Sequence, residues 1–315
     1  MSFINIERHI LLPRLSRREY VKNWWDLSRG ENVALGIGTI CLGALMMGVG
    51  YEESILTLAL HAFCIGAFIA GWFAINDLLD IDVDRINHPD RPLPSDSITE
   101  AGAKKYGNRM IILSGVDLLA IMLEDVRNVG DMAWVDSVAI WLVALLLMIA
   151  YEVDGKPFNP SLKKRMFWGN LTIAMTMAIT ILFGAAAIDY ALHPLLWLVA
   201  AAACVLTTAR EMIMDKCDAI GDVDRNTYAK IKGVERTRKT VWIWSVASCL
   251  LLVMPFAVGY LPWNLVIFIL PSIIFAIMTK PYLSRGKDSE VGNFLRFSMV
   301  SGLAGLATCG IIINW

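Results

Sequence analysis

The stretch ILTLALHAFCIGAFIAGWFAINDLLDIDVDRINHPDRPLPS, residues 55–95, joins a long apolar segment directly to an acidic one. Residues 55–75 contain no Asp, Glu, Lys or Arg. A helix of roughly 17–25 such residues crosses a hydrocarbon core about 30 Å thick. Residues 77–90 then carry five aspartates. The stretch therefore predicts a membrane-spanning helix that ends in a cluster of carboxylates, and such a cluster needs positive charge to balance it.

The composition of the whole chain agrees with a membrane location. Its 315 residues are 57% hydrophobic and 18% charged, with a mean hydropathy of +0.56. Soluble domains average about 25% charged residues. The net charge of −1 gives no indication of a nucleic-acid partner, and the six cysteines lack the spacing of metal ligands or of a disulfide framework.

Apolar stretches predict an all-α, polytopic membrane protein with nine membrane-spanning helices. The nine stretches are residues 33–50, 54–75, 109–124, 134–151, 168–188, 194–212, 240–259, 262–279 and 292–313. The third is short and carries Asp117. A charge inside a membrane is costly and usually faces the protein interior.

The first 32 residues differ from the rest of the chain because arginines and lysines alternate with apolar residues there. No long apolar run follows the first charges, so this segment does not resemble a signal peptide. We expect an amphipathic helix on the membrane surface, with Trp24 and Trp25 at the depth of the headgroups. Residues 33–315 are expected to form a single nine-helix domain.

The distribution of positive charge predicts an orientation. If nine helices span the membrane, every lysine and arginine except Arg127 falls on one side, counting those near the helix ends. Cytoplasmic loops are enriched in these residues. We therefore expect the N-terminus and the four long charged loops in the cytoplasm and the C-terminus outside.

Two acidic triplets share one spacing. The first is Asp77, Asp80 and Asp84, and the second is Asp215, Asp218 and Asp222. Residues at i, i+3 and i+7 lie within roughly 60° of one another on a helix, whereas Asp82 is expected on the opposite side. Each triplet follows an even-numbered predicted helix, so both are expected on the same side of the membrane, where they can converge on one site.

Carboxylates that face one another repel and need a positive partner. Mg²⁺ prefers oxygen ligands and is often held by one or two carboxylates together with substrate phosphates. The pattern therefore indicates a clamp for a diphosphate bridged by Mg²⁺, and nearby cations would stabilise the leaving diphosphate. The candidate cations are Arg85, Arg91, Lys163, Lys164, Arg165, Arg210 and Arg225.

Two simpler interpretations compete with the clamp. The first motif has the early aspartates of an EF-hand calcium loop, but Arg85 replaces the required glycine and Arg91 the terminal glutamate. A single acidic cluster at a helix end is often only a solvated surface. Two clusters of identical spacing on one side of the membrane make that interpretation weaker.

The motifs resemble those of the UbiA superfamily of intramembrane prenyltransferases. NDLLDIDVDRINHPDRPLPS, residues 76–95, resembles its first signature, N-D-x-x-D-x-x-x-D followed by R-P-x-P-S. DKCDAIGD, residues 215–222, resembles the second, D-x-x-D-x-x-G-D. RGEN at 29–32 and LKKRMFWGN at 162–170 resemble two further elements, so the resemblance covers nearly the whole chain.

The resemblance implies nine helices around a central cavity that is open sideways to lipid, capped on the cytoplasmic side by the two Asp-rich loops. It also implies an isoprenyl diphosphate substrate, Mg²⁺ as cofactor and contact with membrane lipid. The implied metal ligands are Asn76, Asp77, Asp80, Asp84, Asp215, Asp218 and Asp222. The residues implied around the diphosphate are Asn32, Asn76, Lys163, Lys164, Arg165 and Arg210. Its transfer reaction ionises the allylic C–O bond, and an acceptor nucleophile then attacks the carbocation.

Departures from the family pattern lie beside the aspartates. Gly30, Asp96, Met214 and Cys217 replace residues that are usual in the family, and RNTYAKIKGVERTRK follows the second motif in an unusual form. These changes leave the second substrate open. The acceptor could be an aromatic ring, a chlorin or a lipid hydroxyl, or the protein could be a terpene cyclase that needs no acceptor. A non-catalytic ion carrier would instead require paired broken helices.

Overall fold

The structure, a computed structural model, describes residues 16–48, 53–128, 130, 132–154, 160–219 and 225–314. Within these ranges it contains helices and no strand, and an isolated bridge joins Arg165 to Asn226. The predicted all-α class is confirmed.

The described residues include nine long helices, each of which coincides with one of the predicted apolar stretches. They are α2 (Gly30–Met47), α3 (Glu53–Leu79), α5 (Glu100–Asn128), α6 (Trp134–Glu152), α7 (Met166–Ala186), α8 (Pro194–Cys217), α10 (Val234–Ala257), α11 (Leu270–Ser284) and α12 (Asp288–Asn314). The shorter elements are α1 (Arg17–Leu27), α4 (Ile81–Asn87), α9 (Tyr228–Lys232) and the 3-10 helices η1 (Leu162–Lys164) and η2 (Trp263–Ile269).

Several long helices extend beyond the stretches predicted for them. α3 continues to Leu79 rather than 75, α8 continues to Cys217 rather than 212, and α2 begins at Gly30 rather than 33. Hydropathy marks only the part of a helix that crosses lipid, whereas backbone hydrogen bonds continue the helix into the polar region on either side. These extensions carry both acidic motifs away from the apolar part of the bundle.

Eight of the long helices in the described residues, with α11 counted together with η2, are long and apolar enough to cross a membrane, judged by length and composition. α5 is not among the eight, and it carries Asp117 at its centre. Nevertheless, Ile112, Val116, Leu119 and Leu123 form an exposed apolar stripe along α5, as expected of a face that contacts lipid. The polytopic architecture is confirmed, and the count of nine spans stays a prediction.

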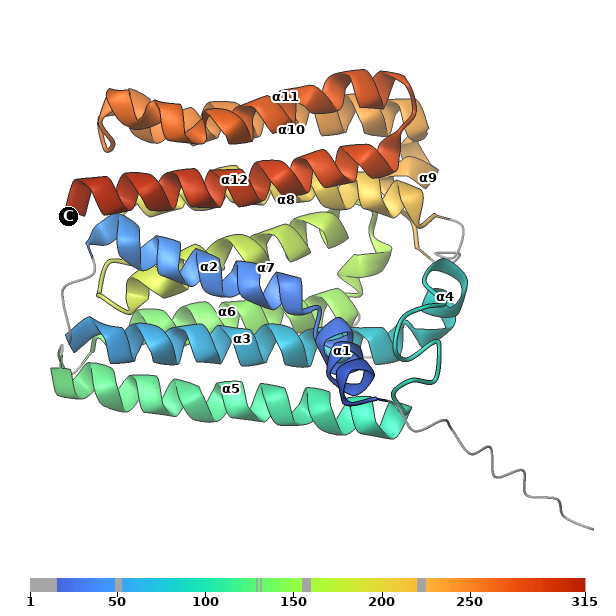
Figure 1. Cartoon of the computed structure of the whole chain (residues 1–315), viewed down its shortest axis with the longest axis horizontal. Helices are drawn as coiled ribbons and strands as arrows, with labels where there is room; N and C mark the ends of the chain where they lie inside the picture. The colour runs from blue at the N-terminus through green and yellow to red at the C-terminus, as the bar shows by residue number, and fades with distance from the viewer. Residues whose placement is uncertain are drawn as a thin grey trace, which may run out of the picture.

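The helices stack in layers with roughly parallel axes. In Figure 1, α5 forms one outer layer and is followed by α3 with α6, α2 with α7, α8 with α12, and finally α10 with α11. Successive layers are in contact through the pairs α3–α5, α6–α7, α7–α8, α8–α10 and α11–α12. α1, α4 and α9 lie at one end of the stack and the end of α12 lies at the other (Figure 1). Both motif-bearing helix ends, of α3 and of α8, therefore lie at the same end, as predicted.

Two glycines allow the central helices α2 and α7 to approach closely. A Cβ atom placed on Gly43 would lie 2.0 Å from the carbonyl oxygen of Ile181, and one placed on Gly184 would lie 2.1 Å from the carbonyl oxygen of Ile40. Only glycine fits at either position, because the obstructing atoms belong to backbone. Small residues at such crossings are typical of membrane helix packing.

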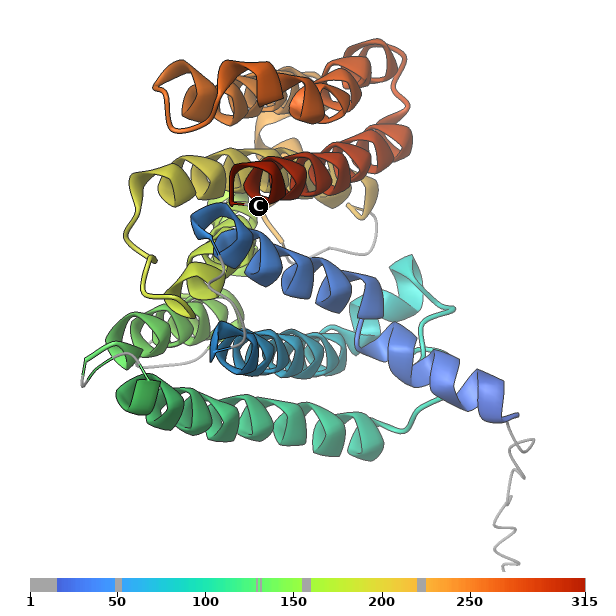
Figure 2. The same cartoon turned by 60° about the vertical axis from the view of Figure 1, so that its left-hand side comes forward.

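α1 begins with a capping box formed by Ser16 and Glu19. Hydrogen bonding to Ser16 lowers the pKa of Glu19 below its ordinary value. Trp24 packs against Tyr106 of α5 with ring centroids 5.1 Å apart, whereas Trp25 is about half exposed. Figure 2 shows α1 projecting obliquely from the end of the bundle. Residues 1–15 lie outside the described residues, and the interfacial role of this segment stays a prediction.

Candidate functional site

A cavity of about 390 Å³ lies between α2, α3, α7, α8 and α12. Its wall changes character along its length. Arg29, Asn76, His88, Arg91 and Asp218 line the end near the acidic motifs. Further along α2, α8 and α12, most of the lining side chains are apolar. The cavity therefore has one polar end and one apolar end, which is the environment that an amphiphilic molecule requires.

The first acidic motif lies where α3 ends and α4 begins. Asp80 has φ −102° and ψ 12°, which interrupts the helix, but its N–H still donates to Asn76 and its carbonyl oxygen accepts from the N–H of Asp84. The backbone therefore keeps the predicted helical spacing through the break. Asp77 and Asp84 are both buried, while the side chain of Asp82 is 88% exposed, as expected from its place on the opposite face.

Arg91 holds the two buried carboxylates together. Its Nη1 atom lies 2.6 and 2.7 Å from the two carboxylate oxygens of Asp84 and 3.9 Å from Oδ1 of Asp77. A guanidinium that serves two carboxylates offsets the repulsion between them. This contact accounts for two aspartates remaining close together in a buried position.

Arg29 is the second partner of Asp77. Its Nη2 atom donates to Oδ1 of Asp77 at 2.7 Å, and its guanidinium lies over the ring of Phe73, 4.5 Å from the centroid. The backbone of Arg29 has φ 46° and ψ 57°, a left-handed conformation that is strained for a residue with a side chain. Strain of this kind persists where the surrounding contacts hold it, and here the contacts aim the side chain at the first motif.

Asp80 faces a different set of cations. Its carboxylate accepts hydrogen bonds from Lys163 at 3.0 Å, Arg225 at 2.9 Å and Asn76 at 3.1 Å. Glu152, the last residue of α6, is buried beside them and accepts from both Asn76 and Lys163. Two acids and two cations thus form one connected, largely buried network at the polar end of the bundle.

The second acidic motif lies at the end of α8. Oδ2 of Asp215 accepts a hydrogen bond of 2.7 Å from Asn170 of α7. Asp218 follows the last turn of α8 and lines the cavity. Its backbone carbonyl oxygen accepts from Asn87 at 3.0 Å, and its Oδ1 atom lies 3.7 Å from Nε2 of His88. Asp222 lies outside the described residues.

The structure therefore brings the two motifs together. Asn87 and His88 of the first motif contact Asp218 of the second, and Arg225, which follows the second motif, binds Asp80 of the first. Asn76, Arg91 and Asp218 border the same cavity. The motifs are far apart in sequence, so this convergence is a result of the helix packing.

The remaining sequence-predicted residues have different environments. Arg85 pairs with Asp82 at 2.9 Å on the exposed side of α4, and Lys164 pairs with Asp154, which is also partly exposed. Arg165 forms the backbone bridge to Asn226.

Two further candidates, Asn32 and Arg210, line the cavity. Arg210 donates to its neighbour Glu211 at 2.8 Å. Its Nε atom is buried without a hydrogen-bond partner within the described residues. This arginine therefore keeps donor capacity for a ligand.

Sequence reasoning did not select several residues that contact the aspartates. Glu152 belongs to no recognised motif, whereas Asn87 and Asn170 lie within the motif segments 76–95 and 162–170 but had no role assigned to them. His88, also in the first motif segment, is half-buried and lines the cavity. Arg29 belongs to the RGEN element, but nothing in the sequence paired it with Asp77. For Glu152, the available signal was its place as a polar residue at the end of an apolar helix.

The donor atoms at this site are chemically suited to Mg²⁺. Asn76, Asp77, Asp80, Asp215 and Asp218 offer oxygen atoms, the ligands that Mg²⁺ prefers. Among the described residues, no three His, Cys, Asp or Glu side chains are close enough to hold a metal ion by themselves. This arrangement fits a Mg²⁺ ion that takes one or two carboxylates and completes its coordination with water and substrate phosphate.

Comparison with known sequences yields a family match over most of the chain. The model of the UbiA prenyltransferase family matches residues 37–314. A digeranylgeranylglyceryl phosphate synthase of Saccharolobus solfataricus is 30% identical over 295 residues, which cover 90% of this chain and 95% of the relative. A protein of the same name from Halobacterium salinarum is 31% identical and covers 80% of this chain and 84% of the relative.

Solved structures share the fold. A digeranylgeranylglyceryl phosphate synthase structure aligns with a TM-score of 0.66 at 23% identity, over 93% of this chain and 99% of its own. A UbiA homologue from Archaeoglobus fulgidus bound to GPP and Mg²⁺ aligns with a TM-score of 0.62 at 19% identity, over 90% of this chain and 99% of its own.

Proposed function

The chain belongs to the UbiA prenyltransferase family, and we propose that it transfers an isoprenyl group from a diphosphate to the hydroxyl group of a glycerol phosphate lipid, with Mg²⁺ as cofactor. As a member of this family it is a prenyltransferase and an integral, multi-pass membrane protein. The proposal adds the cofactor, the two substrates and the residues that act on them.

The convergence of the two acidic motifs on one cavity carries this proposal. The contact between Asn87 and Asp218 and that between Arg225 and Asp80 unite carboxylates from α3 and α8 at the polar end of a cavity whose other end is apolar. A diphosphate with an isoprenyl tail has the same polarity along its length. The structure of a relative bound to GPP and Mg²⁺ supports this assignment of the donor.

The relatives support a lipid acceptor over an aromatic ring or a chlorin. Those with about 30% identity, including the two described above, are named digeranylgeranylglyceryl phosphate synthases. That name describes a product in which two isoprenyl chains are joined to glycerol phosphate. We propose an acceptor of the same class for this chain, namely a glycerol phosphate lipid that carries one chain and a free hydroxyl.

Mg²⁺, when bound, would neutralise charge on the diphosphate and so assist its departure. The residues proposed to hold it are Asn76, Asp77, Asp80, Asp84, Asp215, Asp218 and Asp222. The residues proposed around the diphosphate are Asn32, Asn76, Arg85, Arg91, Lys163, Lys164, Arg165, Arg210 and Arg225. Of these cations, Arg91, Lys163 and Arg225 already contact motif carboxylates. They could exchange these carboxylates for the diphosphate if a metal ion bound the carboxylate oxygens.

The chemistry follows from the two ends of the cavity. The allylic C–O bond breaks, the diphosphate leaves with the bonding electrons, and cationic side chains at the polar end stabilise its charge. The apolar wall keeps water from the carbocation, for which water would be a competing nucleophile. The acceptor hydroxyl oxygen then forms the new C–O bond and releases its proton. The positive charge of the connecting loops supports a cytoplasmic location for this polar end.

Product analysis with purified protein tests the proposal. The protein is incubated with Mg²⁺ and geranylgeranyl diphosphate, alone and with geranylgeranylglyceryl phosphate. We expect an ether product and stoichiometric diphosphate only when the lipid is present. A cyclic hydrocarbon formed without any acceptor would instead identify a terpene cyclase. Asp77→Ala and Asp218→Ala should each abolish turnover in a folded protein, and wild-type turnover in either variant would contradict the assigned clamp.

A further inference from the structure

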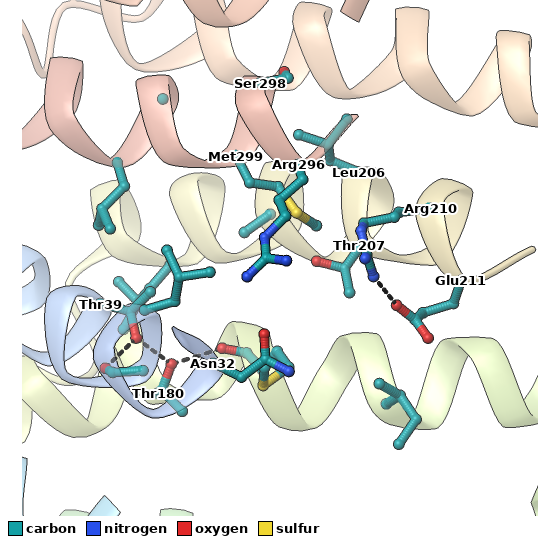
Figure 3. A pocket seen from close by; sticks show the side chains of 18 of the residues that line it. Asn32, Thr39, Thr180, Leu206, Thr207, Arg210, Glu211, Arg296, Ser298 and Met299 are labelled. Atoms are coloured by element: carbon teal, nitrogen blue, oxygen red, sulfur yellow. Dashed lines mark hydrogen bonds and ion pairs between the residues drawn. The ribbon is translucent and has the colours of Figure 1, made fainter. Parts of the chain in front are cut away.

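Arg296 is a cavity-lining cation that has no contact with the acidic motifs in the interactions described above. Arg296 lies on α12, and Figure 3 shows its guanidinium group projecting from α12 into the cavity, between Thr207 of α8 and Asn32 of α2. Of the other arginines that line the cavity, Arg29 and Arg91 are held by motif carboxylates, whereas Arg210 pairs with its neighbour Glu211. Arg296 comes from the opposite wall, and the views in Figures 1 and 2 both place α2 between α12 and α3.

The wall around Arg296 is amphiphilic along the helix axis. Arg296, Met299, Leu303 and Leu306 of α12 all line the cavity. Their spacing of i, i+3, i+7 and i+10 places them in one stripe along the helix. The stripe therefore has a cation at the end toward the loops and three apolar side chains beyond it.

α2 presents a matching stripe across the cavity. Asn32, Leu35, Thr39 and Leu42 line the cavity with the same spacing. Their polar end also lies toward the loops, because α2 begins at Gly30. Two helices thus offer hydrogen-bond donors at one depth and mainly apolar surface further into the membrane. A lipid with a charged headgroup and one isoprenoid chain matches this pattern.

The present partner of Arg296 is one that a ligand can replace. Its Nη2 atom pairs with Glu31 at the start of α2, and the Glu31 side chain is 69% exposed. Exposed ion pairs contribute little to stability. A phosphate monoester carries up to two negative charges and can accept two parallel hydrogen bonds from a guanidinium. It is therefore the stronger partner for Arg296 at the edge of the lipid phase.

We propose that Arg296 binds the phosphate group of the acceptor lipid, with the lipid chain lying along the stripes of α2 and α12. This assignment rests on the proposed function and extends it by naming the residue that selects a phosphorylated acceptor. Gly292, one turn before Arg296, lies against Met214 near the end of α8. Arg296 therefore holds the headgroup within reach of the second acidic motif. In glycerol phosphate, the phosphate and the reacting hydroxyl lie on the same three-carbon unit.

Steady-state kinetics with two acceptors tests this assignment. The acceptors are geranylgeranylglyceryl phosphate and the same lipid without its phosphate, each varied at saturating geranylgeranyl diphosphate and Mg²⁺. Arg296→Ala should raise KM for the phosphorylated lipid about 10- to 100-fold, the range expected for loss of hydrogen bonds to a charged group. KM for the diphosphate donor and for the unphosphorylated lipid should change less than about twofold. Arg296→Lys should restore part of the affinity.

Two further variants separate phosphate binding from a structural role. Glu31→Gln breaks the same ion pair but keeps the guanidinium, so its KM for the phosphorylated lipid should stay unchanged or fall. Lys287→Ala removes an exposed ion pair with Glu290, and neither residue lines the cavity, so this variant should behave as wild type. A KM raised equally by Glu31→Gln and Arg296→Ala would overturn the assignment, because the ion pair itself would then be what matters.

The failure of this assignment is distinguishable from failure of the proposed function. If the wild-type protein transfers a prenyl group to the phosphorylated lipid and Arg296→Ala does so with unchanged KM, only the role of Arg296 is overturned. If Arg296→Ala raises KM for the diphosphate donor instead, Arg296 belongs to the donor site and the assignment is wrong. If the wild-type protein uses neither lipid, the proposed function fails, and the assignment fails with it.

Discussion

The side-chain amide of Asn87 donates a hydrogen bond of 3.0 Å to the backbone carbonyl oxygen of Asp218. Asn87 is the last residue of α4 and Asp218 follows the last turn of α8, so this bond joins the two acidic motifs directly. The bond holds the two motifs together through a backbone atom of Asp218. The carboxylate of Asp218 is therefore available for a ligand. The separation of the two motifs therefore depends on a residue that is not itself acidic.

Asn87→Ala should weaken the use of Mg²⁺. Loss of one hydrogen bond costs about 1 kcal/mol, so we expect a rate of diphosphate release about fivefold lower at subsaturating Mg²⁺ and closer to wild type at saturation. Initial rates measured against Mg²⁺ concentration provide the check. Asn108→Ala, at an exposed position of α5, is the matched control. An Asn87→Ala enzyme with the Mg²⁺ dependence of wild type would show that the bond does not set the spacing of the motifs.

Glu152→Gln should also raise the Mg²⁺ concentration required for half-maximal rate. Glu152 and Asp80 compete for Lys163. Without the Glu152 charge, Lys163 binds Asp80 more tightly and opposes metal binding there, by roughly threefold to tenfold. The same titration of diphosphate release against Mg²⁺ measures the effect. A lower Mg²⁺ requirement in Glu152→Gln would contradict this prediction, because it would mean that Glu152 does not keep Lys163 from opposing metal binding at Asp80.

Gly184→Ala should destabilise the bundle at the crossing of α2 and α7. The added methyl group would lie 2.1 Å from the carbonyl oxygen of Ile40, and overpacking of this kind costs about 1–3 kcal/mol. Gly115→Ala is the control, since a Cβ atom there meets nothing within 4 Å. In a helix interior, alanine is more favourable than glycine by about 0.5–1 kcal/mol. Thermal unfolding in detergent should therefore show a lower Tm for Gly184→Ala and an equal or higher Tm for Gly115→Ala.

Asp96 should tolerate glycine but not valine. Its φ of 56° is in the left-handed region, where aspartate is uncommon and a β-branched residue is a genuine outlier. Asp96→Val should lower stability by about 1–3 kcal/mol, whereas Asp96→Gly should leave Tm unchanged or raise it. Equal stability of both variants would show that this turn relaxes to another conformation.

The sequence was sufficient to predict the helices and the character of the site. Apolar stretches long enough to cross lipid identify themselves by local composition, so each of the nine coincides with a helix of the structure. The boundaries were less predictable, because α3 and α8 continue beyond the lipid-crossing segment. Helical spacing also predicted that Asp77 and Asp84 share a face and that Asp82 points away from it. These properties depend on neighbours along the chain.

Tertiary packing alone decided which charges meet. Arg29 binds Asp77, and Glu152 binds Lys163. Arg85 instead pairs with the exposed Asp82, although the buried Asp84 is its neighbour in the sequence. An ion pair between distant residues depends on how two helices are placed and rotated against each other, and no local pattern encodes that placement. For the same reason only the structure revealed that Arg296 faces the cavity. Composition and spacing determined what kind of protein this is, and the contacts between remote helices determined how its polar residues are arranged for binding.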